Sequence, residues 1–342
     1  CNKDAEAIGA INAVTVAGHV VESPYWHMEL NENGEIGVLY DKKNQRKVDC
    51  GRAMNVFAAF EDKPQRFDAW DVDIYYKEKP YNKFILKERQ VLSQGERAVI
   101  RQIWEFNKSV LTQDMVVWAK EARIDFKTSV DWKEKQVFLK TYFPVDVHAK
   151  EASYEIQFGN VKRPTHSNTE WDFARFEVPG HKWVDLSESG YGVALLNDCK
   201  YGYDVQENVI GLSLIKSAIR PDETADRKVH HFTYSLYPHV GMLEESDVQR
   251  KAVFLNMEVL TKAVKGSAEA KEAFASYGLV ACECGNVLID TVKRSEDGKA
   301  LIIRMYEYQN KKSQGSLTVN APVSSAFECI LCEEEDVPVS VE

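Results

Sequence analysis

The strongest constraint on the fold is a repeated pattern of short segments in which apolar and polar residues alternate between turn residues. The clearest segment is 136–148, QVFLKTYFPVDVH. On an extended chain, one side of it would carry Val137, Leu139, Thr141, Phe143 and Val145. The other side carries aromatic residues around a lysine, so neither face would be purely solvated. That pattern is typical of a strand in a β-sandwich.

Turn dipeptides join neighbouring alternating segments. Asn33-Gly34 lies between two such runs within 25–43, and Asp297-Gly298 lies between two more within 279–310. An Asn-Gly or Asp-Gly step between alternating runs predicts a β-hairpin. The β-branched run 13–21 predicts one further strand. Since only 246–278 has a helix-compatible composition, the chain is predicted to be all-β.

Charge and hydropathy exclude two classes of partner. The formal net charge is −10 and no basic face offsets it, which argues against nucleic-acid binding. No run of 18 or more apolar residues is present, so we expect no membrane span. The sequence starts at Cys1 without a signal peptide or an initiator Met. We expect it to be part of a longer protein.

The cysteines allow two interpretations. The chain has 7 of them, including a C-x-C pair at Cys282 and Cys284 and a C-x-x-C pair at Cys329 and Cys332. Four such thiolates could bind zinc. Residues two apart on a strand also share a face by alternation alone. We favour reduced thiols in a cytoplasmic protein.

Common catalytic motifs are absent: there is no nucleophile elbow, phosphate-binding loop, dinucleotide fingerprint or His-Glu-x-x-His helix. The acidic group Asp62, Asp68, Asp71 and Asp73 could suggest glycosidase carboxylates, but loop and cap residues are the better interpretation.

Two histidines and two aspartates lie in or beside the aromatic segment 165–203. His166, His181, Asp172 and Asp185 match no established metal-ligand spacing, and hydrogen-bonded structural roles are favoured. The alternating aromatic and apolar residues of the same segment are predicted to be core. They are Trp171, Phe173, Phe176 and Val178.

The best candidate site is the turn 197–203, NDCKYGY, which follows the apolar run 193–196 abruptly. Polar groups that bind hydroxyls, beside aromatic faces that cover a sugar ring, suit carbohydrate recognition. A capped surface turn is the simpler alternative. The candidate substrate-binding residues are Asn197, Asp198, Lys200, Tyr201 and Tyr203.

From these residues outward, the chain resembles the C-terminal region of glycoside hydrolase family 38 α-mannosidases, nearest to the cytosolic, vacuolar and bacterial branch. The resemblance is specific, since it rests on several long motifs in order. They are YDK at 40–42, FEDKP at 60–64, DAWDVDIYY at 68–76, the stretches between Arg163 and Asp226 that begin RPTHSNTEWDF, HHFTYSLYPH at 230–239 and SEDGKALIIRMYE at 295–307.

The resemblance implies a large β-supersandwich of the galactose mutarotase type, followed by a smaller β-sandwich. Residues 1–20 would be a remnant of a preceding region, 21–240 the large domain, 241–277 a connector, and 278–342 the small domain, truncated. It also implies that the full-length protein hydrolyses terminal α-mannosides with retention. The nucleophile, the general acid and the zinc ligands would all lie upstream of Cys1. No catalytic residue, metal ligand or cofactor is therefore expected in this chain.

The implied partners are a mannoside substrate and the protein's own N-terminal catalytic barrel, with a homo-oligomer also possible. The resemblance further implies that one loop of the sandwich reaches the mannose site, and the turn 197–203 matches that loop best. Two alternatives stay open. One is a stand-alone carbohydrate-binding β-sandwich; the other is a mutarotase-like enzyme, for which no His and Glu pairing is evident.

Overall fold

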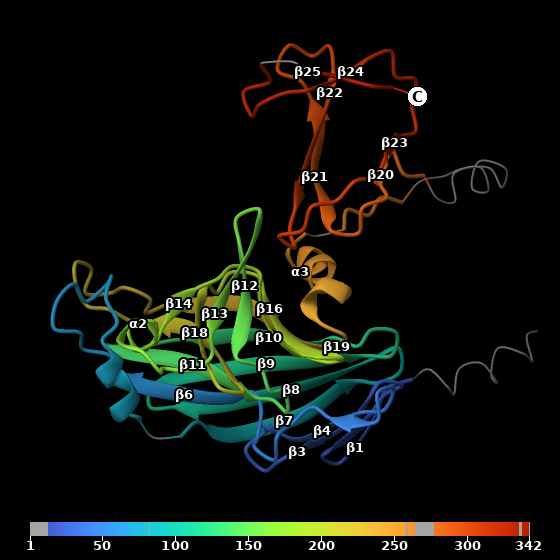
Figure 1. Ribbon diagram of the computed structural model, residues 1–342. Helices are drawn as coiled ribbons and strands as arrows, with labels where there is room; N and C mark the ends of the chain where they lie inside the picture. The colour runs from blue at the N-terminus through green and yellow to red at the C-terminus, as the bar shows by residue number, and fades with distance from the viewer. Residues whose placement is uncertain (1–12, 82, 258, 264–276, 335–336, 342) are drawn as a thin grey trace, which may run out of the picture. The chain divides into compact units, whose positions relative to one another are not determined.

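The computed structural model describes residues 13–81, 83–257, 259–263, 277–334 and 337–341. It divides into two compact units, Cys1–Ile156 with Val161–Glu258, and Gln157–Asn160 with Val259–Glu342. Strands dominate both units (Figure 1). Among the described residues, no helix combines the length and the apolar character that crossing a bilayer requires.

The largest element of unit 1 is a 9-stranded sheet with the order β13-β12-β15-β16-β19-β10-β9-β8-β7. Its described strand pairs are antiparallel, and the central strand β19 pairs with β16 on one side and β10 on the other. The strands are β7 (Ile85–Ser93), β8 (Arg97–Phe106), β9 (Ser109–Trp118), β10 (Ile124–Asp131), β12 (Glu151–Ile156), β13 (Gly159–Pro164), β15 (Trp183–Glu188), β16 (Tyr191–Asn197) and β19 (Val229–Val240).

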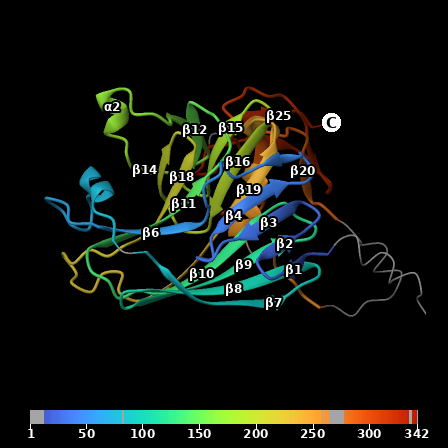
Figure 2. The same cartoon turned by 90° about the horizontal axis from the view of Figure 1, so that it is seen from below.

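Two 5-stranded sheets complete unit 1. One has the order β14-β17-β18-β11-β6, with strands β6 (Val56–Glu61), β11 (Val137–Pro144), β14 (Val178–Pro179), β17 (Gly202–Gln206) and β18 (Val209–Lys216). The other runs in sequence order through β1 (Thr15–Ala17), β2 (Val20–Glu22), β3 (Trp26–Leu30), β4 (Ile36–Asp41) and β5 (Arg46–Lys47). Figure 2 shows the same strands from below.

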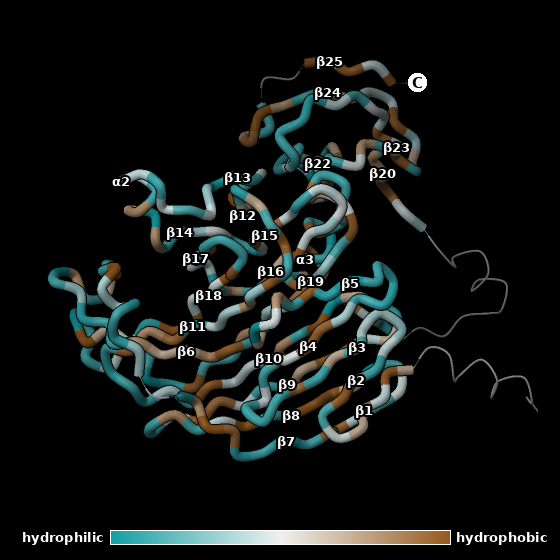
Figure 3. Tube along the Cα trace, turned by 60° about the horizontal axis from the view of Figure 1, so that its bottom comes forward, coloured by the Kyte–Doolittle hydropathy of each residue, from teal (hydrophilic) through white to brown (hydrophobic). Residues whose placement is uncertain are grey.

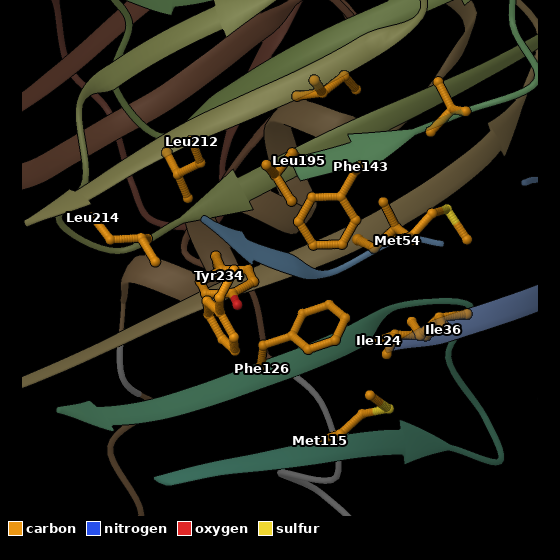
Figure 4. Close-up of a cluster of buried hydrophobic side chains, with 14 of the residues drawn as sticks. Ile36, Met54, Met115, Ile124, Phe126, Phe143, Leu195, Leu212, Leu214 and Tyr234 are labelled. Atoms are coloured by element: carbon orange, nitrogen blue, oxygen red, sulfur yellow. The ribbon is translucent and has the colours of Figure 1, made fainter. Parts of the chain in front are cut away.

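The main core of unit 1 gathers apolar side chains from all three sheets (Figure 4). Phe126 of β10 stacks on Tyr234 of β19 with ring centroids 5.1 Å apart, and Phe143 of β11 meets both rings. Alternation along the strands produces this arrangement, because every second side chain points to the same face. Along the Cα trace, the colours accordingly switch between apolar and polar (Figure 3).

Strand β11 is buried on both faces. The predicted core side, Val137 to Val145 at odd positions, is buried as expected. On the opposite side Phe138 and Lys140 are buried too, because the segment around Tyr76 covers them. That segment contains a short 3-10 helix, η1 (Ile74–Glu78).

The predicted single strand at 13–21 is wrong, because the chain turns within it. Strands β1 and β2 pair with each other, and the turn between them contains Gly18 at φ +62°. Glycine adopts this left-handed conformation without steric cost, so the run folds back on itself. The two predicted hairpins are confirmed: β3 pairs with β4, and β21 (Val287–Arg294) pairs with β22 (Leu301–Glu307).

Unit 2 is built from two-stranded antiparallel pairs. Besides the hairpin β21–β22, strand β20 (Val280–Cys282) pairs with β23 (Leu317–Val319), and β24 (Ala326–Glu328) pairs with β25 (Val337–Val339). The all-β sandwich prediction is thus confirmed. Within the predicted connector 241–277 lies the helix α3 (Val248–Asn256), and residues 258 and 264–276 of that range are outside the described residues.

Candidate functional site

The turn 197–203 leaves the end of β16 and enters β17, and its first residue anchors it. Asn197 is fully buried. Its Nδ2 donates to the carbonyl of His181 at 2.8 Å and also contacts the Tyr203 hydroxyl. Its Oδ1 accepts the Lys200 backbone N–H at 2.6 Å. Asn197 therefore holds both ends of the turn through one amide.

Two more of the predicted residues face inward. Tyr203 is fully buried, and its hydroxyl donates to the carbonyl of His181 at 3.0 Å. Burial raises the pKa of this phenol well above its usual range. Asp198 accepts the backbone N–H of Thr233 on β19 at 2.9 Å, which ties the turn to the larger sheet. These side chains fix the position of the turn.

The tip of the turn carries the accessible chemistry. Tyr201 is 49% exposed, and its ring lies edge-on to the imidazole of His181 with centroids 5.2 Å apart. The Lys200 ammonium lies 4.6 Å from the ring centroid of Phe232, and burial lowers its pKa. The Cys199 thiol has its pKa raised to about 11, first by burial and then by Asp198, so it is not an activated nucleophile.

The structure thus brings all five predicted residues into one turn but divides them by depth. Asn197 and Tyr203 are inside the protein, where a sugar could reach them only after rearrangement. Tyr201 is the most exposed of the five. An exposed ring on a rigidly held turn can stack on the apolar face of a sugar.

A buried ionic cluster on the outer face of β11 escaped the sequence analysis. Lys140 has no exposed surface, and its Nζ lies 2.7 Å from Oδ1 of Asp204 on β17. The same ammonium contacts the Glu177 carboxylate and lies 3.0 Å from Ser213 Oγ on β18. Burial alone would lower the pKa of Lys140, but the charges of Asp204 and Glu177 outweigh it, so the pKa is raised.

The cluster also holds the segment that covers it. The Tyr76 hydroxyl of η1 donates to Glu177 Oε1 at 2.5 Å, and the Tyr76 ring packs edge-on against Phe138. Since the ammonium is enclosed and each carboxylate is paired, this cluster is suited to positioning η1 and not to acid–base chemistry. The one sequence clue was a lysine between Phe138 and Tyr142 in a strand with the alternation of a core strand.

A second buried group joins β15 and β19. His239 Nε2 lies 2.7 Å from Asp185 Oδ2, and the Ser187 hydroxyl also contacts Asp185. A nucleophilic triad needs the serine bonded to the histidine, whereas here both bond to the aspartate. A Cβ on Gly192 would lie 2.3 Å from Ser187 Oγ, so the group is closely packed. It is a structural ion pair.

This ion pair predicts a pH-dependent stability. Burial alone would lower the pKa of His239, but Asp185 outweighs it, and the folded pKa lies above the usual 6.5. A raised histidine pKa stabilises the fold below the unfolded value, and that contribution is lost as pH rises through the folded value. We expect the melting temperature of wild type to exceed that of His239→Gln by more at about pH 5.5 than at about pH 9. Equal differences at both pH values in thermal melts would contradict this assignment.

The other candidate ligands do not converge. His166 lies 3.7 Å from Asp172, His181 lies 3.6 Å from Glu155, and Asp185 belongs to the His239 pair. Within the described ranges, no three His, Cys, Asp or Glu side chains are placed to hold a metal ion. The described cysteines, which include Cys282, Cys284, Cys329 and Cys332, are unbridged.

The acidic residues between 62 and 73 hold a loop in place. Asp62 is buried against the Lys216 ammonium, Asp68 accepts the N–H of Ile219 at 2.7 Å, and Asp73 accepts the N–H of Gln65 at 2.8 Å. Each of these carboxylates holds part of the loop.

The core prediction for Trp171 and Phe173 is wrong. Both lie on the helix α2 (Glu170–Phe173), and both are more than half exposed. The Thr169 side chain caps the helix by accepting the Asp172 N–H, so the segment leaves the sheet and its alternation has no strand to follow. Of the other two predicted core residues, Phe176 is half-buried, and Val178 returns to the sheet as β14 and is buried.

Comparisons with known proteins cover most of the chain. Residues 21–224 match the description "Glycosyl hydrolases family 38 C-terminal domain", and residues 286–342 match "Glycosyl hydrolases family 38 C-terminal beta sandwich domain". Alpha-mannosidase G of Dictyostelium discoideum is 36% identical over 327 residues, which is 92% of this chain and 30% of that protein. Alpha-mannosidase 2C1 of Homo sapiens is 38% identical over 294 residues, 84% of this chain and 28% of that protein.

A solved structure shares the fold. The crystal structure of an alpha-mannosidase from Enterococcus faecalis matches with a TM-score of 0.72 at 14% identity, over 92% of this chain and 39% of that chain. The chain accordingly spans less than a third of the length of the two sequence relatives named above.

Proposed function

Since this chain belongs to glycosyl hydrolase family 38 and forms its C-terminal region, we propose that it is the non-catalytic β-part of a retaining α-mannosidase. The observation that carries the proposal is the family match at 21–224, together with 36% identity to an alpha-mannosidase over 92% of the chain. In this role the chain packs on the catalytic part of the full-length protein and contributes to its sugar site.

The chemistry of the described residues favours a non-catalytic role for this chain. The carboxylates of Glu177, Asp204 and Asp185 are each engaged with a basic side chain, so none of the three is available as a nucleophile or general acid. Retaining glycosidases use two carboxylates on either side of the scissile bond. We propose that this pair, and the zinc of the family, belong to the part of the protein outside this chain.

Tyr201 is the residue we propose to touch or border the mannoside. Its ring is half exposed, and the turn beneath it is held by Asn197 and Tyr203. The backbone is fixed as well, since the Tyr201 carbonyl accepts the Gly180 N–H at 3.1 Å. A ring held in this way loses little entropy when it stacks on a sugar.

The free thiols support a cytoplasmic location, which we include in the proposal. The described cysteines form no disulfide, although several are partly exposed. Thiols persist in reducing compartments. Fractionation of cells that express the full-length protein tests this point.

Hydrolysis of a chromogenic α-mannoside with added zinc tests the proposed function. We expect the full-length protein to hydrolyse it and this chain alone to be inactive. We further expect Tyr201→Ala in the full-length protein to lower kcat/KM about tenfold, which is about 1.4 kcal/mol of lost transition-state stabilisation. The matched control is Tyr277→Ala, since Tyr277 is also exposed but lies in unit 2.

The outcomes separate the alternatives. Activity of the chain alone would mean that a complete catalytic site lies within it. Sugar affinity of the chain without any activity of the full-length protein would favour a stand-alone carbohydrate-binding module. If Tyr201→Ala and Tyr277→Ala left kcat/KM equally unchanged, the turn would have no part in the sugar site.

A further inference from the structure

Two surface segments of unit 1 expose aromatic side chains at one end of that unit. Trp70 is 73% exposed and Trp171 is 78% exposed. The first lies in the loop that precedes η1, and the second lies on α2 (Figures 1 and 2). We call their exposed aromatic residues together the aromatic end, which consists of Phe67, Trp70, Tyr75, Trp171 and Phe173.

The aromatic end is held in place from below. The Tyr76–Glu177 hydrogen bond joins η1 to the chain between α2 and β14. The loop before η1 is fixed to the end of β18 by the Asp62–Lys216 ion pair and by the hydrogen bond from Ile219 N–H to Asp68. Both segments are therefore presented on a rigid base, although neither buries its largest side chains.

Such an arrangement indicates an interaction surface. Soluble proteins rarely leave several large aromatic residues exposed together unless a partner covers them. Aromatic residues, above all Trp and Tyr, are enriched at the centres of protein interfaces. The aromatic end combines this composition with a preorganised backbone, which lowers the entropic cost of docking.

Two positively charged side chains beside α2 indicate that the partner carries a negative charge. Arg163 of β13 lies over the ring of Tyr154, 4.6 Å from its centroid, and its Nη1 is buried without a hydrogen-bond partner in the described part of the chain. Burial, and then the positive charge of Arg175 just after α2, lower the pKa of Arg163. Arg163 itself is half-buried, and a guanidinium can bind a planar carboxylate through two parallel hydrogen bonds.

We propose that the aromatic end docks on the catalytic part of the full-length protein, and that a carboxylate of that part meets Arg163 and Arg175. The inference rests on the proposed function and adds its interface. The lengths of the relatives indicate what covers the aromatic end. The two sequence relatives match this chain over 30% and 28% of their own lengths, so most of a polypeptide of that size lies outside this chain. A tethered domain has a high effective concentration and occupies such a surface before a free partner can.

Residue-resolved hydroxyl-radical labelling tests the surface, because Trp oxidation reports side-chain exposure. In this chain alone, we expect Trp70 and Trp171 to be labelled rapidly. In the full-length protein, we expect labelling at least about fivefold slower, because an interface core excludes water. Trp104 and Trp183 are buried in the structure and serve as slow references in both samples.

A matched pair of variants gives a second readout. Trp70→Ala with Trp171→Ala should leave the melting temperature of this chain nearly unchanged, because exposed substitutions cost little. The same pair should lower the melting temperature of the full-length protein by several degrees, about 2–4 °C per kcal/mol lost. The control Phe254→Ala alters an exposed ring on α3 and should have little effect in either protein.

Three results would overturn the proposal. Equal labelling of Trp70 and Trp171 in both proteins would leave the surface open. Protection in this chain alone that grows with concentration would assign the surface to a second copy. Protection of the full-length protein only after a mannose oligosaccharide is added would make it a sugar site. Hydrolysis is measured in the same samples, so protection without hydrolysis would reject the proposed activity and retain the interface.

Discussion

Lys140→Met should destabilise unit 1 by about 3–5 kcal/mol, the cost of leaving buried charges without their partner. The ammonium is fully enclosed and lies between the carboxylates of Asp204 and Glu177. Lys77 also forms an ion pair with Asp204, at 3.4 Å, so Asp204 keeps one cationic partner whereas Glu177 loses its ammonium. Methionine has a similar length, and the loss would therefore reflect charge and not volume. Urea denaturation of the wild type and the variant measures the difference.

The control for this prediction removes the carboxylates as well. In the triple variant Lys140→Met, Glu177→Gln, Asp204→Asn, no fully buried charge of the ion cluster is left, and only the partly exposed Lys77 loses its ion pair. We expect at least about half of the lost stability to return. A loss below about 1 kcal/mol in the single variant would mean that water reaches the carboxylates. Because Tyr76 bonds to Glu177, hydrogen exchange at η1 should also accelerate in the single variant.

Asn197→Ala should cost about 1–3 kcal/mol, because it leaves the Lys200 N–H without its acceptor and removes one of the two donors to the His181 carbonyl. The amide serves the His181 carbonyl, the Lys200 N–H and the Tyr203 hydroxyl at once. Chemical denaturation measures the loss. In the full-length protein, kcat/KM for the α-mannoside should fall too, since Tyr201 depends on this turn.

Two comparisons isolate the role of this amide. Tyr203→Phe removes only the hydroxyl and should cost less, because the His181 carbonyl keeps its bond from Asn197. Asn168→Ala alters an exposed asparagine and should change stability by less than about 0.5 kcal/mol. If Asn197→Ala cost no more than Asn168→Ala, the turn would be held by its backbone alone.

Alternation and turn chemistry were enough to predict the sandwich. The β11 pattern predicted the correct core face, and Asn33-Gly34 and Asp297-Gly298 lie between the paired strands that they predicted. Predictions from alternation failed where a glycine turn or a helix cap changed the direction of the chain. Gly18 splits one predicted strand into a hairpin, and the Thr169 cap starts α2 and carries Trp171 away from the core.

The buried side-chain contacts could not be predicted from sequence, because the residues that form them are far apart along the chain. Lys140, Glu177 and Asp204 come from separate segments that only the sheet brings together. The turn 197–203 was predicted as a polar and aromatic group, but alternation does not show which of its side chains point inward. Burial of Asn197 and exposure of Tyr201 are properties of the packed sheets.

The central position of β19 constrains the order in which the protein can form during synthesis. Strand β10 pairs with β19 from Ile124↔Leu236 to Asp131↔Val229, and β16 pairs with the same strand on its other edge. On the ribosome, β10 and β16 therefore wait with one edge unpaired until the chain has been synthesised past Val240. Contacts this distant slow folding, and open edges invite pairing with other chains. Nascent chains that stop before β19 should therefore depend on chaperones that bind exposed strands.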